Sequence, residues 1–254
     1  MGRAVEFHER IGSTNDRART ALREPGGDGL AVVADEQTEG RGRRGRAWLS
    51  PPGRNLLVSV ALRPRAPMEL ARLIGFSAAL AAMRACTTCS GGATLAIRWP
   101  NDIVDEAGRK VAGLLVETAV EGERISEAVI GIGTNVNWRS AEMPDEIAAR
   151  STSLADLAGA DVDRVALLGD LLAALDDELR DLENGISPIP RLRRHSWLDG
   201  REIAVDLGDR RVTGRASGIA DDGALLLHSG GELLILLVGE VVRVTDAPAV
   251  GALS

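Results

Sequence analysis

The chain has 254 residues, 44% of them hydrophobic and 26% charged, which is typical of a globular protein large enough to form its own core. Thirty Lys and Arg against 37 Asp and Glu give a net charge of −7, which argues against a protein whose whole surface binds nucleic acid. The longest unbroken apolar runs, Ala78 to Met83 and Leu233 to Val238, are far shorter than the roughly 20 residues of a membrane span. No apolar stretch typical of a secretory signal follows Met1, so we expect a cytoplasmic protein without a membrane partner.

The first part of the chain alternates short apolar strands with helical stretches, which predicts an α+β fold with a mixed sheet and flanking helices. Ser13 to Asp16 has capping-box spacing and marks the start of a helix. A second helix is expected after Pro67 as far as Ala82, and a third from a cap at Asp163 to Asn184-Gly185. The strands expected in one sheet are Ala31–Ala34, Leu56–Leu62, Leu95–Trp99, Val111–Glu117 and Ala128–Gly133.

After Trp197 the chain consists of strand-like segments separated by Gly and Asp turns. These strands are expected at Glu202–Leu207, Val212–Ile219, Ala224–His228 and Leu233–Val244. We therefore predict a domain over residues 1–197, a small SH3-like β-barrel domain over 198–246, and a frayed tail over 247–254.

Two cysteines, Cys86 and Cys89, form a lone Cys-x-x-Cys within a helical stretch. A zinc site needs two more ligands of suitable spacing, and the three histidines are scattered singly. Packing within a helix is the favoured interpretation, with a redox or metal role as the alternative.

The densest chemical feature is Gly40-Arg41-Gly42-Arg43-Arg44-Gly45-Arg46, which precedes Trp48. The four arginines repel one another and the three glycines provide no side chain to pack, so we expect a loop that is mobile until an anion orders it. The alternatives are a solvated basic loop or a non-specific RNA contact.

Three later segments also carry polar groups suited to a ligand. Asn101-Asp102 follows Trp99-Pro100, either as an ordinary turn or as a site for a nucleotide or for a metal beside phosphates. Lys110 begins an apolar strand, where a surface lysine is also commonplace. Gly131 to Gly133 is a weak signal for a dinucleotide loop, and Asn135 suits either backbone fixing or ligand contact.

Taken in chain order, these segments resemble biotin protein ligase, from about Ile11 to Val244. The segments that carry the resemblance are Gly12-Ser13-Thr14-Asn15, Gln37 with Gly40 to Arg46, Trp99-Pro100-Asn101-Asp102, Lys110-Val111-Ala112-Gly113 and Gly133-Thr134-Asn135-Val136. Residues 218–227 resemble the C-terminal domain of the family. Some members carry an N-terminal helix-turn-helix domain, whereas here the motifs begin at residue 11, so we expect no specific DNA binding.

The resemblance implies a two-step reaction. Biotin and Mg-ATP give biotinyl-5′-AMP and pyrophosphate, and a lysine of biotin carboxyl carrier protein then attacks the mixed anhydride. It implies biotin binding by Ser13, Thr14, Asn15, Gln37, Gly40, Arg41, Gly42, Arg43, Lys110 and Gly113. It implies ATP binding by Arg43, Trp48, Asn101, Asp102, Lys110 and Asn135, catalysis by Lys110, Arg43 and Arg46, and a contact of Asp102 with Mg²⁺.

Two other functions stay open at this point. A lipoate or octanoate ligase-like enzyme also transfers an acyl group, but its substrate lacks the ureido ring that suits Ser13, Thr14 and Gln37. A non-enzymatic anion or RNA-binding module needs only the arginine loop and gives no role to Lys110. The sequence leaves the oligomeric state and the identity of the acceptor open.

Overall fold

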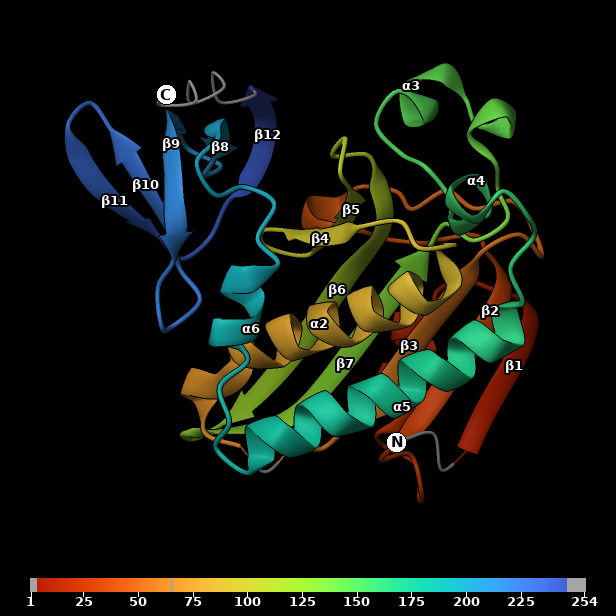
Figure 1. Cartoon of the computed structure of the whole chain (residues 1–254). Helices are drawn as coiled ribbons and strands as arrows, with labels where there is room; N and C mark the ends of the chain where they lie inside the picture. The colour runs from red at the N-terminus through yellow and green to blue at the C-terminus, as the bar shows by residue number, and fades with distance from the viewer. Residues whose placement is uncertain (1–3, 65, 246–254) are drawn as a thin grey trace.

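Two sheets organise the chain in the computed structural model, which describes residues 4–64 and 66–245 (Figure 1). The first sheet has seven strands in the order β1-β2-β3-β7-β6-β5-β4. β1 and β2 are parallel and every other neighbouring pair is antiparallel, which confirms the predicted mixed sheet. The strands are β1 (Ala4–Ile11), β2 (Leu30–Gln37), β3 (Leu56–Leu62), β4 (Leu95–Arg98), β5 (Asp102–Asp105), β6 (Lys110–Glu121) and β7 (Arg124–Thr134).

Helices cover both faces of this sheet. α2 (Ala71–Cys89) and α5 (Arg164–Glu183) run side by side over one face (Figure 1). α1 (Thr14–Ala21) packs on the opposite face. Its Ala18 clusters with Val32 of β2 and Ala61 of β3, whereas the residues on either side of these two point into the main core, as the alternation along a strand requires. The remaining helical segments are η1 (Arg43–Gly45), η2 (Met68–Leu70), η3 (Ser140–Glu142), α3 (Asp145–Ala148), α4 (Leu154–Ala158) and α6 (Ile189–Arg194).

The packing of α5 gives a first stability prediction. Leu175 of α5 is completely buried in the core, so Leu175→Ala should lower the free energy of unfolding by about 2–5 kcal/mol. Val165 on the same helix is 78% exposed, and Val165→Ala should change it by less than about 0.5 kcal/mol. Urea denaturation of both variants measures the difference, and equal losses would contradict this packing.

The second sheet is antiparallel, with five strands in the order β11-β10-β9-β8-β12. Its strands are β8 (Glu202–Asp206), β9 (Arg211–Ile219), β10 (Leu225–Ser229), β11 (Glu232–Leu236) and β12 (Glu240–Thr245). The indole N–H of Trp99 donates to the carbonyl of Gly223 at 3.1 Å, and Phe76 lies against Gly223. The hydrophobic core of the first sheet therefore continues into the second.

The structure differs from the predicted elements at several places, and the short helices α3, α4 and α6 were not predicted. β1 was not predicted. Its apolar residues Val5 and Phe7 alternate with polar ones, but both are exposed, because this edge strand buries neither of its faces completely. The predicted strand Leu233–Val244 is two strands, separated near Gly239, whose φ of +153° favours glycine. The turn predicted after the strand that ends at Arg98 is present at residues 99–101, but Asp102 then begins β5, a strand that was not predicted. The predicted tail at 247–254 lies outside the described residues.

One helical stretch, Met68–Cys89, is long and apolar enough by length and composition to cross a membrane, although charged and polar residues interrupt its apolar runs. Sixty-one per cent of its most apolar window is buried inside the structure. Its last turn contains Cys86, whose burial raises the pKa of the thiol to about 12, as in an unreactive packing cysteine. The stretch contains α2, which is therefore a core helix that packs between the first sheet and α5.

Candidate active site

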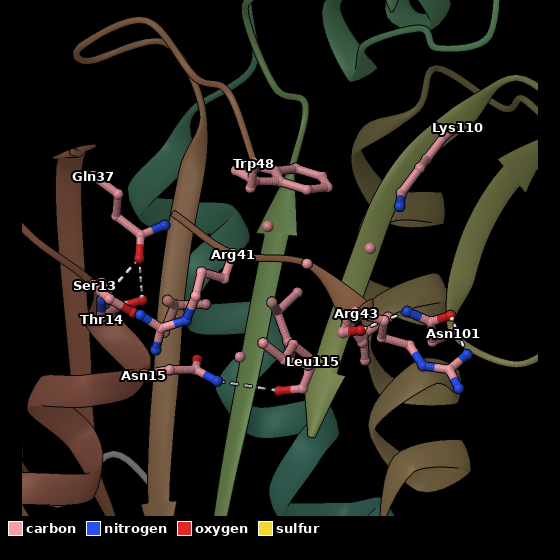
Figure 2. A pocket seen from close by; sticks show the side chains of 17 residues that line it. Ser13, Thr14, Asn15, Gln37, Arg41, Arg43, Trp48, Asn101, Lys110 and Leu115 are labelled. Carbon is pink, nitrogen blue, oxygen red and sulfur yellow. Dashed lines mark hydrogen bonds between the residues drawn. The ribbon is translucent and has the colours of Figure 1, made fainter. Parts of the chain in front are cut away.

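A cavity that is partly open to solvent lies on the face of the first sheet that α1 covers (Figure 2). It brings together residues from α1, the end of β2, the arginine loop, β6 and β7. The predicted site residues that line it are Ser13, Thr14, Asn15, Gln37, Arg41, Gly42, Arg43, Trp48, Asn101, Lys110 and Gly113. Segments as distant as Ser13 and Lys110 therefore share one site.

The N-terminus of α1 forms the polar end of this cavity. Ser13 is the N-cap residue, and its side chain accepts a hydrogen bond from the backbone N–H of Asp16. The main-chain N–H of Thr14 donates to Oε1 of Gln37 at 2.8 Å, and the Thr14 hydroxyl lies 3.0 Å from the same oxygen (Figure 2). The residues at the start of α1 therefore cap the helix and also line the cavity. Their donors and acceptors suit a small polar ring.

Ser59 is a site residue that the sequence analysis missed. It lies on β3, is completely buried, and contacts Thr14 Oγ1 at 2.7 Å and Asn15 Oδ1 at 2.6 Å. The Asn15 amide also donates to the Glu117 carboxylate at 2.7 Å. A Cβ on Gly131 would lie 2.1 Å from Asn15 Oδ1, so glycine is needed there. A lone serine within the apolar run of β3 was the available signal.

Trp48 lies across the floor of the cavity, between Gln37 and Lys110 (Figure 2). A Cβ on Gly133 would lie 2.5 Å from its ring, and the Lys110 ammonium lies 5.2 Å from the ring centroid. The indole N–H is buried and has no hydrogen-bond partner in the described part of the chain. Gly131 and Gly133 belong to β7 and admit Asn15 and Trp48, so they do not form the dinucleotide loop considered above.

Lys110 forms an ion pair with Asp102, whose Oδ1 lies 2.6 Å from the ammonium. Arg98 binds Oδ2 of the same carboxylate at 2.8 Å. Burial of Asp102 disfavours its charged form, but the two cations outweigh burial and hold the pKa of Asp102 below its ordinary value. Among the described residues no group of three or more His, Cys, Asp or Glu side chains could hold a metal ion. The contact of Asp102 with Mg²⁺ stays a prediction, and the geometry favours an ion pair.

The arginine loop is a short hairpin whose base is closed by a bridge between Arg41 and Ala47. Gly40 lines neither cavity, but its carbonyl accepts from Trp48 N–H at 2.9 Å, so it belongs to this base. Arg43 donates to Oδ1 of Asn101 at 3.4 Å and to the carbonyl of Gly239 at 3.3 Å.

The other three arginines of the loop pair with carboxylates. Arg41 binds Asp16 of α1 at 2.5 Å. The other two arginines bind residues of the second sheet. Arg44 donates to the backbone carbonyl of Asp206 at 3.0 Å and lies 3.4 Å from the Asp206 carboxylate, and Arg46 forms an ion pair with Glu240. The mutual repulsion expected from the sequence is therefore offset by partners from distant segments.

A second, larger cavity adjoins the first and shares Arg43, Trp48, Asn101 and Lys110 with it. It is also lined by the predicted residues Arg46, Asp102 and Asn135. The Asn135 amide donates to the carbonyls of Lys110 at 3.3 Å and Thr152 at 3.2 Å, so it fixes the backbone at the start of β6. The lining residues Trp138, Ile147 and Arg150 were not predicted. Ile147 lies in α3, which is too short to show periodicity, and the other two lie outside helices and strands.

Residues 7–135 match the Biotin/lipoate A/B protein ligase family, and residues 200–244 match the Biotin protein ligase C terminal domain. The chain is 35% identical over 234 residues to the bifunctional ligase/repressor BirA of Bacillus subtilis, covering 90% of this chain and 70% of that protein. It is 35% identical over 245 residues to the biotin--[acetyl-CoA-carboxylase] ligase of Paracoccus denitrificans, covering 91% and 97%. A solved structure of biotin protein ligase from Aquifex aeolicus in complex with biotin and ATP is similar, with a TM-score of 0.78 and 29% identity over 96% of this chain and 99% of that chain. The chain therefore belongs to the biotin/lipoate A/B protein ligase family and, within it, to the biotin protein ligases.

Proposed function

We propose that this protein activates biotin with ATP to biotinyl-5′-AMP and then transfers biotin to a specific lysine of a biotin carboxyl carrier protein. The observation that carries the proposal is the junction of the two cavities. The first holds the polar groups of Ser13, Thr14 and Gln37 at one end, and Lys110 lines both cavities. A lysine there can contact both the carboxylate of an acid bound in the first cavity and a phosphate bound in the second.

In the first step a biotin carboxylate oxygen attacks the α-phosphorus of ATP, forming a C–O–P linkage while the bond to pyrophosphate breaks. Two anions approach each other, so cations fixed at the junction lower the barrier. Lys110 is held there by Asp102, and Arg43 by Asn101 and the Gly239 carbonyl. We propose that Lys110 and Arg43 neutralise the reacting groups and that Arg46, in the second cavity, acts on the nucleotide side.

The ligand assignments follow the two cavities. Ser13, Thr14, Asn15 and Gln37 suit the ureido ring, which has two N–H donors and one carbonyl acceptor. The aliphatic chain of biotin then runs over Gly131 and Gly133 of β7 toward Lys110, where Gly113 leaves room beside Trp48. We propose that Trp48 covers the adenine and that Asn101 and Asn135 lie on the nucleotide side.

Magnesium is proposed to enter with ATP, because Mg²⁺ is usually bound by substrate phosphates together with one or two carboxylates. Asp102 does not fit a dedicated Mg²⁺ ligand, since both of its carboxylate oxygens already bind cations. We therefore derive no catalytic step from a metal contact with this chain.

The two parts of the chain, residues 1–197 and 198–246, are proposed to act together, because the second sheet supplies acceptors to the arginine loop. The reaction is placed in the cytoplasm, where ATP is available, and the proposal includes neither DNA nor a membrane. The polar ring pocket argues against a lipoate or octanoate ligase, whose acids offer no matching group. An RNA-binding role is disfavoured because Asp16, Asp206 and Glu240 neutralise three of the loop arginines.

The test is release of pyrophosphate from ATP by the purified chain. Release should require biotin and should not occur with lipoate or octanoate in its place. In the second stage, a carrier domain with its acceptor lysine should become biotinylated, and a carrier with that lysine replaced by arginine should not. Pyrophosphate release with lipoate or octanoate but not with biotin would contradict the proposed function.

A further inference from the structure

We propose that Asp102 prevents the enzyme from biotinylating itself, because it holds Lys110 in the protonated form that cannot act as a nucleophile. The proposal rests on the proposed function, since it concerns the fate of biotinyl-5′-AMP in the same two cavities. Lys110 lines both cavities and therefore lies where the mixed anhydride forms. Asp102 thus decides whether biotin is available to the carrier or remains on the chain.

Lys110 is the only lysine among the 254 residues, so its amine is the only side-chain amine that the protein has. The arginine loop beside the cavities carries four arginines and no lysine. A guanidinium stays protonated in proteins and therefore does not compete for an acyl group as an amine does. Lys110 is accordingly the single side chain of this protein that can form a stable amide with biotin.

An unprotonated Lys110 would react as the acceptor lysine of the carrier does. Its Nζ would attack the carbonyl carbon of biotinyl-5′-AMP, and the nitrogen would lose a proton as the amide forms. The bond between that carbon and the phosphate oxygen would break, and AMP would leave with the bonding electrons. The amide has no charge, so the cation that stabilises the first step would be lost. An ammonium group has no lone pair and cannot react in this way.

Two groups in the site favour the ammonium form of Lys110. Oδ1 of Asp102 lies 2.6 Å from its Nζ, and the centroid of the Trp48 ring lies 5.2 Å from the same atom. A carboxylate and the face of an aromatic ring both stabilise a cation. The side chains of Lys110 and Asp102 are only 26% and 19% exposed, so salt and water screen this pair less than an ion pair on the surface.

Arg98 fixes the carboxylate of Asp102 in this place. It binds Oδ2 at 2.8 Å and also donates to the carbonyl of Gly108 at 3.1 Å, so its guanidinium is itself anchored. Burial disfavours the charged form of Asp102, yet Lys110 and Arg98 hold its pKa below the ordinary value. Asp102 is therefore a carboxylate at neutral pH, and its Oδ1 stays directed at Lys110.

The experiment measures biotin on Lys110 by peptide mass spectrometry, after the purified chain has been incubated with preformed biotinyl-5′-AMP without a carrier. The preformed intermediate makes the result independent of the first step, which loss of Asp102 should also slow. An opposite charge at this distance changes the population of the uncharged amine by about 10-fold or more, so Asp102→Asn should carry at least about 10-fold more biotin on Lys110 than the wild type. Asp102→Glu retains a carboxylate and should carry far less than Asp102→Asn.

Asp105→Asn is the matched control. Asp105 is a buried carboxylate at the end of the same strand, β5, but it pairs with Arg109 instead of Lys110. Its replacement should leave Lys110 as free of biotin as in the wild type. The double variant Asp102→Asn/Lys110→Arg should carry no biotin at position 110, and the N-terminal amino group is counted in a separate peptide. Thermal melting confirms folding, and Asp102→Ala is the second variant if Asp102→Asn does not fold.

A carboxylate that merely orients Lys110 predicts slower adenylation in Asp102→Asn but no biotin on Lys110. Equal labelling of Lys110 in the wild type and in Asp102→Asn would therefore overturn the proposal, as would labelling of Asp105→Asn to the level of Asp102→Asn. If the wild type releases no pyrophosphate from ATP with biotin, the proposed function fails. Labelling by the preformed intermediate then still decides the role of Asp102.

Discussion

Replacing Lys110 with alanine is expected to reduce biotin-dependent pyrophosphate release by about 10²- to 10³-fold, the usual loss when a fixed charge-stabilising group is removed from an active site. Lys110 lies where the two cavities meet and, like Arg43, lines both. Transfer from preformed biotinyl-5′-AMP should fall less, because the bond to pyrophosphate has already been broken. The two half-reactions are measured separately, with Lys110→Gln as the variant closest in size.

The ion pair with Asp102 adds a pH dependence to this prediction. The pKa of Asp102 is lower in the folded chain than its ordinary value. The ionised carboxylate therefore stabilises the fold at any pH above the ordinary pKa. This stabilisation is lost as the pH falls through the pKa of the folded chain. Without Lys110 only Arg98 still opposes the effect of burial, and the pKa of Asp102 should rise. The acid unfolding midpoint of Lys110→Ala should therefore move to higher pH. An unchanged midpoint together with an unchanged rate of pyrophosphate release would mean that Lys110 is an ordinary surface lysine.

Arg43→Gly is expected to release the intermediate while adenylation continues at a reduced rate, because Lys110 still neutralises the reacting groups. Arg43 joins the arginine loop to Asn101 and to the Gly239 carbonyl of the second sheet, so its loss detaches the loop from the edge of the second cavity. An open loop exposes the mixed anhydride to water and allows biotinyl-5′-AMP to dissociate. Lysines of an unrelated protein such as serum albumin should then become biotinylated, which a streptavidin blot measures against labelling of the carrier domain.

The second sheet offers variants that test the same loop without altering it. Asp206→Asn and Glu240→Gln each remove the carboxylate partner of one loop arginine and should produce weaker stray labelling in the same direction. Glu232→Gln is the control, because Glu232 lies on β11, at the opposite edge of this sheet from β12. Labelling confined to the carrier in Arg43→Gly would show that the loop does not retain the intermediate.

Much of the architecture is determined locally, and these parts could be predicted from the sequence. Helix α5 buries one apolar stripe, so a period of three to four residues marks it, and Asp163 caps it as expected. Helix α2 lies where it was predicted, but every residue from Phe76 to Met83 is buried, so it does not have the single buried stripe that was expected. The central strands are continuous apolar runs and are equally recognisable, as β3 shows. The order of polar segments, from Ser13 to Asn135, also indicated the function, because the motifs lie in short stretches of chain. The mobility expected of the arginine loop stays a prediction.

Other features depend on which segments meet, and no local pattern contains that information. A single serine in β3 is unremarkable until the sheet brings Ser59 between Thr14 and Asn15. Four arginines in six positions indicate repulsion, yet the tertiary structure places Asp206 and Glu240 of the second sheet beside two of them. Asp102 suited a metal ion by its chemistry, but the hairpin of β4 and β5 directs it between Arg98 and Lys110. Secondary structure follows from the burial pattern along the chain, whereas the charge and hydrogen-bond direction of each polar group are set by neighbours distant in sequence.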